Sequence, residues 1–514
     1  MKPSNELFEL IKSLTKSEKR FFKLQSSLQS GDKNYIRLFD TIDKMQEYDE
    51  EEIKKVFKGE KFIKHLPSEK NHLYKVILKA LRSFYGETSI SSMLKQEIKN
   101  IEILYNKALF DECNKFLDRA KKVAIKYEKF YYLYELINWE KTLLEEAYED
   151  GQFKDLNKLI EEEREVLEKL RNLAEYHVLY SKINYVFRSG GYARTEENKI
   201  IIEDIVNHPL IKGKNTALSR RAATICYYTQ GFCNMANGDY PTALEKFQRV
   251  IAILDENVDL RTDLAKRYVR TLSNIVTCHL DLQNVEDARK VINLIQSFSE
   301  SDGFTFPDVQ STIFKNSNLA KLEVYHHTGG FAMALKEVEG IIAQMAEYEG
   351  KISKESQLTF YYQFAFIHFG VHQHNKALFW LNKVLNDNEK DLRQDIFSYA
   401  RLFNLVVHYE LGNHDLLEYT IKSTARYLQK RERDFPIEKH IMEQMKKLIR
   451  TQNVNERAKI FEQFKLGMKK LLKGPEDLIV LKYFDFNIWI ESKINNTSYE
   501  EELLSSKNSM KRTT

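Results

Sequence analysis

Three histidines are the first residues whose type and spacing suggest chemistry. His368 and His372 are four residues apart, so they share a helical face, and His374 follows in the next turn. Three imidazoles can hold zinc or nickel. No carboxylate or cysteine accompanies them, and three histidines alone rarely suffice. The favoured interpretation is therefore that His368 packs between helices while the other two lie at a turn.

Two acid-rich stretches could supply paired carboxylates for acid–base catalysis or cation binding. Residues 145–150 place acids four apart on one helical face, and residues 161–163 are a run of glutamates. No other groups converge on them in the sequence, so a solvated face is favoured. The chain also lacks a phosphate-binding loop, a dinucleotide-binding glycine pattern, an HExxH motif and a GxSxG elbow. We predict a non-catalytic protein without a cofactor.

A basic stripe near the N-terminus could contact nucleic acid. Its residues lie on one face of a helix: Lys16, Lys19, Arg20 and Lys23. Thr15 and Glu18 have the spacing of a capping box at the start of this helix. Such a stripe can grip phosphates. Residues 1–90 carry 18 basic against 14 acidic residues, a small excess that favours a solvated or docking face.

The elements that position these residues follow from composition. With 18 glycines and 7 prolines in 514 residues, the chain has less than half of the roughly 12% that these residues take in average usage. Sheet proteins use them at turns and junctions, so a large sheet protein is excluded. With 43% hydrophobic and 30% charged residues, the chain has enough apolar material to fold. We expect an all-α protein.

Several features predict a cytoplasmic location. The N-terminus has no apolar stretch typical of a signal peptide. The longest uncharged run, 356–375, contains seven Gln, His and Asn residues that would be costly in lipid, so we expect no membrane span.

The formal net charge of +4 is too small to mark a general nucleic-acid binder. Buried free thiols are expected at the four cysteines: Cys113, Cys226, Cys233 and Cys278.

Repeated pairs of helices organise most of the sequence. The clearest copy is TQGFCNMANGDYPTALEKFQRVIAIL, residues 229–254. Gly231 lies inside the first helix, where close approach by a neighbouring helix would offset its cost of about 1 kcal/mol relative to alanine. Residues 238–240, Gly-Asp-Tyr, form the turn, and Ala243 and Phe247 follow on the second helix. This arrangement resembles the tetratricopeptide repeat (TPR) consensus.

The same frame recurs along the chain at intervals of 39–48 residues, about 43 on average. The standard TPR period is 34 residues, and HEAT and armadillo units run to about 40–47. We interpret the copies as TPR-like hairpins with helices of roughly 17–19 residues. The resemblance covers about two-thirds of the chain and implies an α-solenoid. The frame positions are Cys113, Leu156, Thr195, Ala243, Ala288, Ala334, Ala377 and Leu417.

The domain organisation follows from this frame and its breaks. A polar stretch starting at Gly86 interrupts the helical pattern, and terminal units of an array must seal its exposed core. We predict an N-terminal helical unit (1–85), a linker (86–94), a TPR-like repeat array (95–430), C-terminal capping helices (431–492) and a polar, disordered tail (493–514).

The TPR resemblance implies a non-catalytic scaffold for protein–protein interaction. The first helices of such hairpins line a concave groove that suits a peptide or a partner helix. The residues predicted to face it are Tyr228, Phe232, Leu319, Glu323, His326, Tyr362, Phe366 and Phe369. The alternative is that several of these aromatic residues belong to the core between repeats.

A second hypothesis is a nucleic-acid-linked regulator. In it, the basic N-terminal unit contacts DNA or RNA, and the repeat array senses a peptide or protein. Bacterial regulators that join a helix-turn-helix to a TPR-like array provide the analogy. Residues 1–85 show no helix-turn-helix pattern, so the scaffold is the leading hypothesis.

Overall fold

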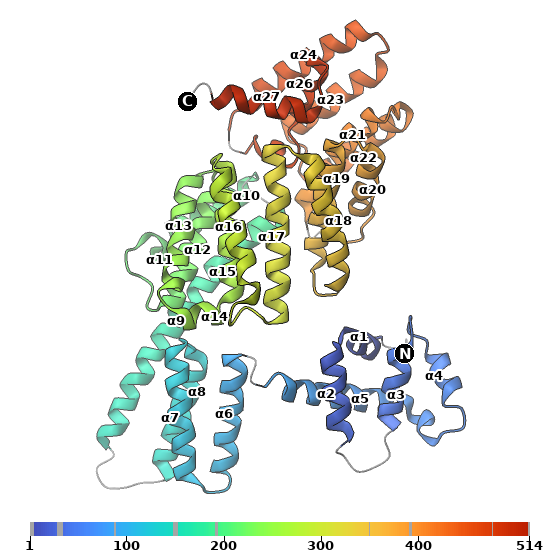
Figure 1. The fold of residues 1–514 in the computed structure, drawn as a ribbon. Helices are drawn as coiled ribbons and strands as arrows, with labels where there is room; N and C mark the ends of the chain where they lie inside the picture. Colours follow the sequence, from blue (N-terminus) through green and yellow to red (C-terminus); the bar gives the residue numbers. More distant parts are fainter. Residues whose placement is uncertain are drawn as a thin grey trace. The chain divides into compact units, whose positions relative to one another are not determined.

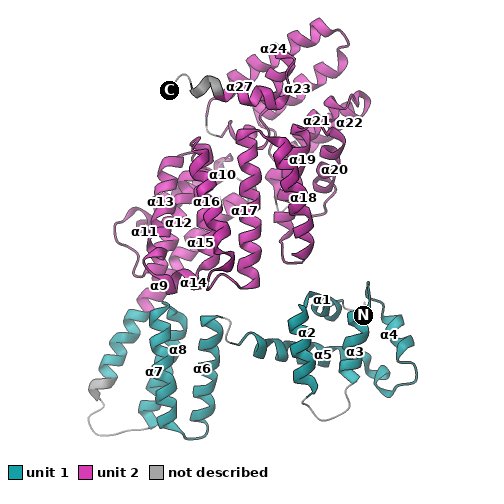
Figure 2. Cartoon of the chain, in the orientation of Figure 1, with its two compact units in different colours: residues 1–166 teal, residues 167–514 magenta. Residues whose placement is uncertain are grey.

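The fold is entirely helical wherever it is described. The computed structural model describes residues 5–27, 34–86, 89–146, 153–190, 194–348, 350–389, 393–474 and 476–511. These ranges contain 27 α-helices, two short 3-10 helices and no β-strand (Figure 1). The predicted all-α class is therefore confirmed. The chain forms two compact units, unit 1 (residues 1–166) and unit 2 (residues 167–514) (Figure 2).

Unit 1 begins with a group of short helices around their own core. The helices are α1 (Glu6–Ser13), α2 (Lys16–Ser27), α3 (Asn34–Lys44), α4 (Glu50–Val56), the 3-10 helix η1 (Lys61–His65) and α5 (Leu66–Phe84). Each buries an apolar stripe at helical spacing, such as Leu7 and Ile11 of α1 or Leu73 and Ile77 of α5. This core is confined to residues 7–81.

The predicted capping box starts α2. The Glu18 carboxylate accepts a hydrogen bond from the Thr15 backbone N–H at 2.5 Å, and Thr15 Oγ1 accepts one from the Glu18 N–H at 3.3 Å. The other Glu18 oxygen accepts from the Tyr85 hydroxyl at 2.5 Å. Burial, together with this carboxylate, raises the pKa of Tyr85 to about 12. The cap of α2 is thereby joined to the end of α5.

The second part of unit 1 consists of longer helices: α6 (Ile90–Tyr105), α7 (Phe110–Lys126), α8 (Phe130–Glu146) and the beginning of α9 (Phe153–Gly190). Helix α6 takes up most of the predicted linker, because Ser89 caps its N-terminus by accepting the Ser92 N–H at 3.1 Å. Within the run 161–163, Glu162 pairs with Lys121 at 2.9 Å. This run therefore contributes to helix packing; residues 147–152 lie outside the described residues.

Unit 2 contains helical hairpins in which each second helix contacts the first helix of the next hairpin. They are α12–α13 (Arg220–Ala236, Tyr240–Asp255), α15–α16 (Ala265–Asp281, Val285–Ser297), α17–α18 (Pro307–Thr328, Phe331–Glu347), α19–α20 (Lys354–Gly370, His374–Leu385), α21–α22 (Gln394–Glu410, His414–Lys430) and α23–α24 (Pro436–Arg450, Val454–Leu471). The remaining helices are α10 (Glu196–Asn207), α11 (Pro209–Lys212), α14 (Val258–Asp263), η2 (Phe298–Glu300), α25 (Ile479–Tyr483), α26 (Phe486–Asn495) and α27 (Tyr499–Lys511). The architecture is thus repeat-like.

Seven of the eight frame positions fall at the fourth residue of a helix, and six of them have no exposed surface. The six are Cys113, Ala243, Ala288, Ala334, Ala377 and Leu417. Five residues before each of the six, the backbone has a positive φ that ends the preceding helix: Ala108, Gly238, Gln283, Gly329, His372 and Gly412. Thr195 is the exception and caps α10. No turn residue interrupts the preceding α9, which runs for 38 residues.

The end of the chain corrects the prediction of a disordered tail over 493–514. Helix α26 continues to Asn495, and α27 spans Tyr499–Lys511; residues 512–514 lie outside the described residues. The reason is that Tyr499 and Leu503, four residues apart, are buried in the core of unit 2. Helix α27 is polar on its other side, and these two apolar side chains attach it to an aromatic part of the core.

Gly231 occupies the close helix contact that the sequence predicts. A Cβ at this position would lie 2.6 Å from the ring of Phe247, well inside contact distance. The Phe247 ring is fully buried and also packs against Tyr228 and Phe232 at 5.7 Å between centroids. It therefore has little room to move, and the packing of α12 on α13 requires glycine at 231.

Gly231→Ala is expected to lower the free energy of unfolding by about 1–3 kcal/mol, because the added methyl overpacks the contact with Phe247. Gly340 of α18 is the matched control, since a Cβ there would meet no atom within 4 Å. Gly340→Ala is expected to stabilise by up to about 1 kcal/mol through helix propensity. Urea unfolding followed by circular dichroism measures both. Equal stabilisation of the two variants would refute the close contact.

Candidate functional site

The residues predicted to bind a partner lie on the first helices of the hairpins. We call the surface formed by α12, α15, α17, α19 and α21 the first-helix face. Tyr228 is buried, and its ring lies 5.7 Å from Tyr180 of α9. Phe232 is half-buried and lies 4.8 Å from Phe187 of α9. Both aromatic residues are thus packed against α9, and the stated alternative of a core position describes them better than the predicted groove position.

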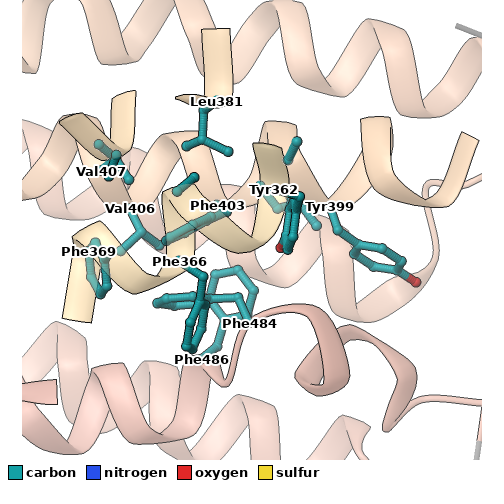
Figure 3. Packing of buried hydrophobic residues seen from close by; sticks show 14 of the residues in the cluster. Tyr362, Phe366, Phe369, Leu381, Tyr399, Phe403, Val406, Val407, Phe484 and Phe486 are labelled. Atoms are coloured by element: carbon teal, nitrogen blue, oxygen red, sulfur yellow. The ribbon is translucent and has the colours of Figure 1, made fainter. Parts of the chain in front are cut away.

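Tyr362, Phe366 and Phe369 are also core residues, each no more than 3% exposed. They are covered by the end of the chain, residues 476–511, which we call the C-terminal segment. The ring of Phe484 lies 5.4 Å from Phe369 and 6.1 Å from Phe366 (Figure 3). The alternative stated for these aromatics, a core position, therefore describes them. They are not exposed because the chain itself occupies this part of the face.

The aromatic contacts of the C-terminal segment extend over two adjacent first helices. Tyr483 stacks on Tyr399 of α21 at 4.1 Å, and Phe484 stacks on Phe403 of the same helix at 4.6 Å. Tyr499 then lies 5.8 Å from Phe366 of α19. Stacked and edge-to-face pairs of this kind add about 0.5–1.5 kcal/mol beyond area burial. The segment is therefore held mainly by ring packing.

Polar contacts fix the register of the C-terminal segment. Lys482 forms an ion pair with Asp281 at 2.7 Å and donates a hydrogen bond to the Tyr240 hydroxyl. Tyr362 donates to the Tyr483 carbonyl oxygen at 3.2 Å. Glu500 accepts the backbone N–H of Phe331 at 3.0 Å, so its carboxylate caps the N-terminus of α18. The segment binds by aromatic rings and by charged side chains of both signs, as a separate peptide would.

The other three predicted groove residues lie on α17, beside the C-terminal segment. Leu319 is partly buried against the same core, and His326 stacks on Phe366 at 3.7 Å. Burial lowers the pKa of His326 to about 3. Burial, with the nearby charge of Asp281, raises the pKa of Glu323 to about 7 despite the presence of Lys482. Glu323 therefore holds its proton at a higher pH than an exposed glutamate does.

Glu323→Gln is expected to stabilise the protein at pH 8 and to leave its stability unchanged at pH 4. The folded pKa of about 7 exceeds the ordinary glutamate value of 4.5, so the folded state holds the extra proton between these values. The contribution of Glu323 to the free energy of unfolding of the wild type therefore falls as pH rises from 4.5 to 7, by at most about 3 kcal/mol. Unfolding free energies of both proteins across pH 4–8 give the difference. A difference that does not grow with pH would exclude the raised pKa.

The three histidines considered as metal ligands do not converge on one point, although the rings of His372 and His374 lie 5.8 Å apart. His368 is buried and donates from Nδ1 to Gln373 Oε1 at 3.0 Å. His372 has a positive φ in the turn, and His374 packs 5.1 Å from Phe369. Within the described residues, no group of three His, Cys, Asp or Glu side chains is arranged to hold a metal ion. His368 thus stabilises the turn between α19 and α20.

The N-terminal basic stripe is partly neutralised by α3. Lys19 pairs with Asp43 at 2.6 Å, and Lys23 pairs with Asp40 at 2.6 Å. Lys16 and Arg20 are exposed. Two of the four charges are therefore used to dock α2 on α3, which leaves too few on this face for a strong phosphate contact.

A second group of cations, which the sequence prediction did not include, lies on the first-helix face outside the C-terminal segment. Arg267 and Arg270 of α15 and Lys315 of α17 form what we call the cationic cluster. Arg267 is also near enough to Arg221 of α12 for the two charges to interact, and His177 of α9 is near both. Lys315 follows Arg270 by 45 residues and Arg267 follows Arg221 by 46. Alignment of the repeats would have revealed this shared face.

Two hollows border the helices of unit 2. One of about 560 Å³ lies between α9 and α10 and is lined by His177, Val178, Tyr185 and Ile201, among others. Because His177 is near Arg267, this hollow adjoins the cationic cluster. The other, of about 640 Å³, lies between α16, α17 and α18. The first hollow is thus lined by α9 and α10 beside the cations, and the second is lined in part by α17 of the first-helix face.

In comparisons with known proteins, neither a protein-family model nor a curated protein matches the sequence. Among the described residues, no helix combines the length and apolar character needed to cross a bilayer. All four cysteines are buried and free, as expected from their helical patterns.

Proposed function

We propose that this protein is a non-catalytic interaction scaffold that binds a peptide or partner helix on the first-helix face. In this proposal the hairpins of unit 2 form a TPR-like superhelix, and their first helices line its concave side. The C-terminal segment fills the part of this groove at α19 and α21. The external partner binds the remaining part, at α15 and α17, because α9 packs on α12.

The observation that carries the proposal is the way in which the C-terminal segment occupies the first-helix face. Three consecutive residues, 482–484, make an ion pair, a backbone hydrogen bond and two ring stacks with helices α15, α19 and α21. A face that receives the end of α25 and the residue after it in this manner has the chemistry to receive a segment of another chain.

The nucleic-acid hypothesis has less support. Its basic stripe retains two exposed cations after the pairing of Lys19 and Lys23. We expect gel-shift titrations with duplex DNA and single-stranded RNA to show no binding tighter than micromolar at 150 mM salt. Submicromolar binding that weakens steeply with salt would reinstate this hypothesis.

A steric block tests the scaffold proposal. Arg270→Trp places a bulky side chain on the first-helix face, and Arg249→Trp places the same one on the second helix α13; both arginines are exposed. Immunoprecipitation of the full chain from its native cell, with quantitative mass spectrometry, is expected to recover a partner with wild type and Arg249→Trp. Recovery should fall at least tenfold with Arg270→Trp. Undiminished recovery with a folded Arg270→Trp variant, or no enriched partner with wild type, contradicts the proposal.

A further inference from the structure

The cationic cluster specifies the chemistry of the partner. Resting on the proposed function, we infer that Arg267, Arg270 and Lys315 bind a peptide segment that carries acidic side chains, either carboxylates or phosphates. The inference goes beyond a general binding surface, because it assigns a charge to the ligand and a site to its recognition.

The first argument is that these cations have no carboxylate of their own. Among the described residues, none of the three forms an ion pair within 4.0 Å, although most buried charges in proteins are paired. Arg267 donates only to the Thr224 hydroxyl, at 2.8 Å. Arg270 of α15 and Lys315 of the neighbouring α17 thus have no ion-pair partner among the described residues.

The second argument is that nearby acids already have partners. Asp263 pairs with Arg221 at 2.5 Å. The charge of Glu355 also reaches Lys315, but this carboxylate forms ion pairs with Arg188 at 3.1 Å and with Arg393 at 3.8 Å. The described part of unit 2 therefore supplies too little negative charge to neutralise the cluster, and an anion from outside fits this deficit.

The third argument is the electrostatic strain that the cluster carries. Burial, followed by the charge of Arg221, lowers the pKa of Arg267 to about 10. Burial and the charge of Arg270 lower the pKa of Lys315. Like charges kept close on a half-buried surface destabilise the free protein, and a bound carboxylate or phosphate removes this cost. Ligand binding and the relief of repulsion are therefore coupled.

The surroundings favour a peptide over a nucleic acid. A nucleic-acid backbone needs a track of cations along several phosphates, whereas this cluster is a group of three cations on two helices. The adjacent hollow exposes Val178 and Tyr185, which are 56% and 58% exposed. An apolar side chain next to acidic residues fits both features.

Fluorescence anisotropy on the full chain tests this assignment. The probes are a labelled peptide with four glutamates and one phenylalanine, its phosphoserine counterpart, its glutamine counterpart, and a 20-nucleotide single-stranded DNA. Wild type is expected to bind the glutamate or the phosphoserine peptide at least tenfold more tightly than the glutamine peptide, with weakening at high salt. Whichever of these two peptides binds more tightly shows whether the site prefers carboxylates or phosphates. Equal binding of the glutamine peptide, no binding of either acidic peptide, or tighter binding of the DNA overturns the inference.

Charge variants complete the test. Arg270→Gln/Lys315→Gln is expected to lose at least tenfold in affinity for the acidic peptide and to melt at the same or a higher temperature, because repulsion is relieved. Arg249→Gln on α13 should change neither property. A lower melting temperature with unchanged affinity would make the cations structural. If a native partner is lost with Arg270→Trp but still binds the double glutamine variant, the scaffold proposal stands and the inference of an acidic ligand is refuted.

Discussion

Phe484→Ala is expected to lower the free energy of unfolding of unit 2 by about 3–5 kcal/mol, the range for removing a buried phenylalanine side chain. Phe484 is 1% exposed and contacts rings of α19, α21 and α27. Its loss removes the central contact between the C-terminal segment and the first-helix face. Urea unfolding gives the energy, and limited proteolysis should show new cleavage between residues 472 and 499.

The control for Phe484→Ala is Phe379→Ala. Phe379 lies on α20 and is 53% exposed, so its truncation should cost less than about 1 kcal/mol. If Phe484→Ala is as stable and as protease-resistant as Phe379→Ala, the segment is not anchored on the first-helix face.

The second large effect is expected at Arg194, which precedes α10. Its guanidinium pairs with Glu438 of α23, donates to the Tyr399 hydroxyl at 2.7 Å, and lies 3.9 Å from the ring centroid of Phe435. Arg194 and Glu438 have side chains only 6% and 2% exposed. Arg194→Met leaves the carboxylate buried without its cation, which should cost about 3–5 kcal/mol. Denaturant unfolding measures the loss.

A double substitution distinguishes a buried pair from simple packing at this position. Arg194→Met/Glu438→Leu removes both charges and is expected to be more stable than Arg194→Met alone. The exposed pair Arg164–Glu161 provides the control, because Arg164→Met should change stability by less than about 1 kcal/mol. A double variant that is less stable than the single one would show that the ion pair is not the source of the effect.

Local features of the fold were predictable because their causes are local. Thr15 and Glu18 cap α2 through contacts three residues apart, and Gly231 faces Phe247 within one hairpin. The frame positions repeat because each hairpin needs a small or apolar residue at the fourth position of a helix. The frame position predicted at Thr195 was wrong because the frame was measured from turn to turn. Helix α9 continues for 38 residues without a turn, so the count was shifted there.

The candidate site was less predictable because it depends on contacts between distant parts of the chain. Phe366 looks like a groove residue from its place on a first helix, yet Phe484 and Tyr499, over 100 residues later, cover it. Hydrophobic periodicity gives the buried face of a helix but not the identity of what covers it. The cationic cluster was not predicted for a different reason: Lys315 of α17 meets Arg267 and Arg270 of α15 only after folding.

Site-specific photo-crosslinking in the native cell tests the central claim most directly, namely that the first-helix face binds a partner protein. A photoreactive residue replaces Lys315 on α17 in one variant and Lys290, an exposed residue of the second helix α16, in the other. The account predicts a discrete cross-linked product from position 315, to a protein with acidic residues at the cross-linked site, and none from position 290. Cross-linking only from position 290, or from neither position, would contradict the account.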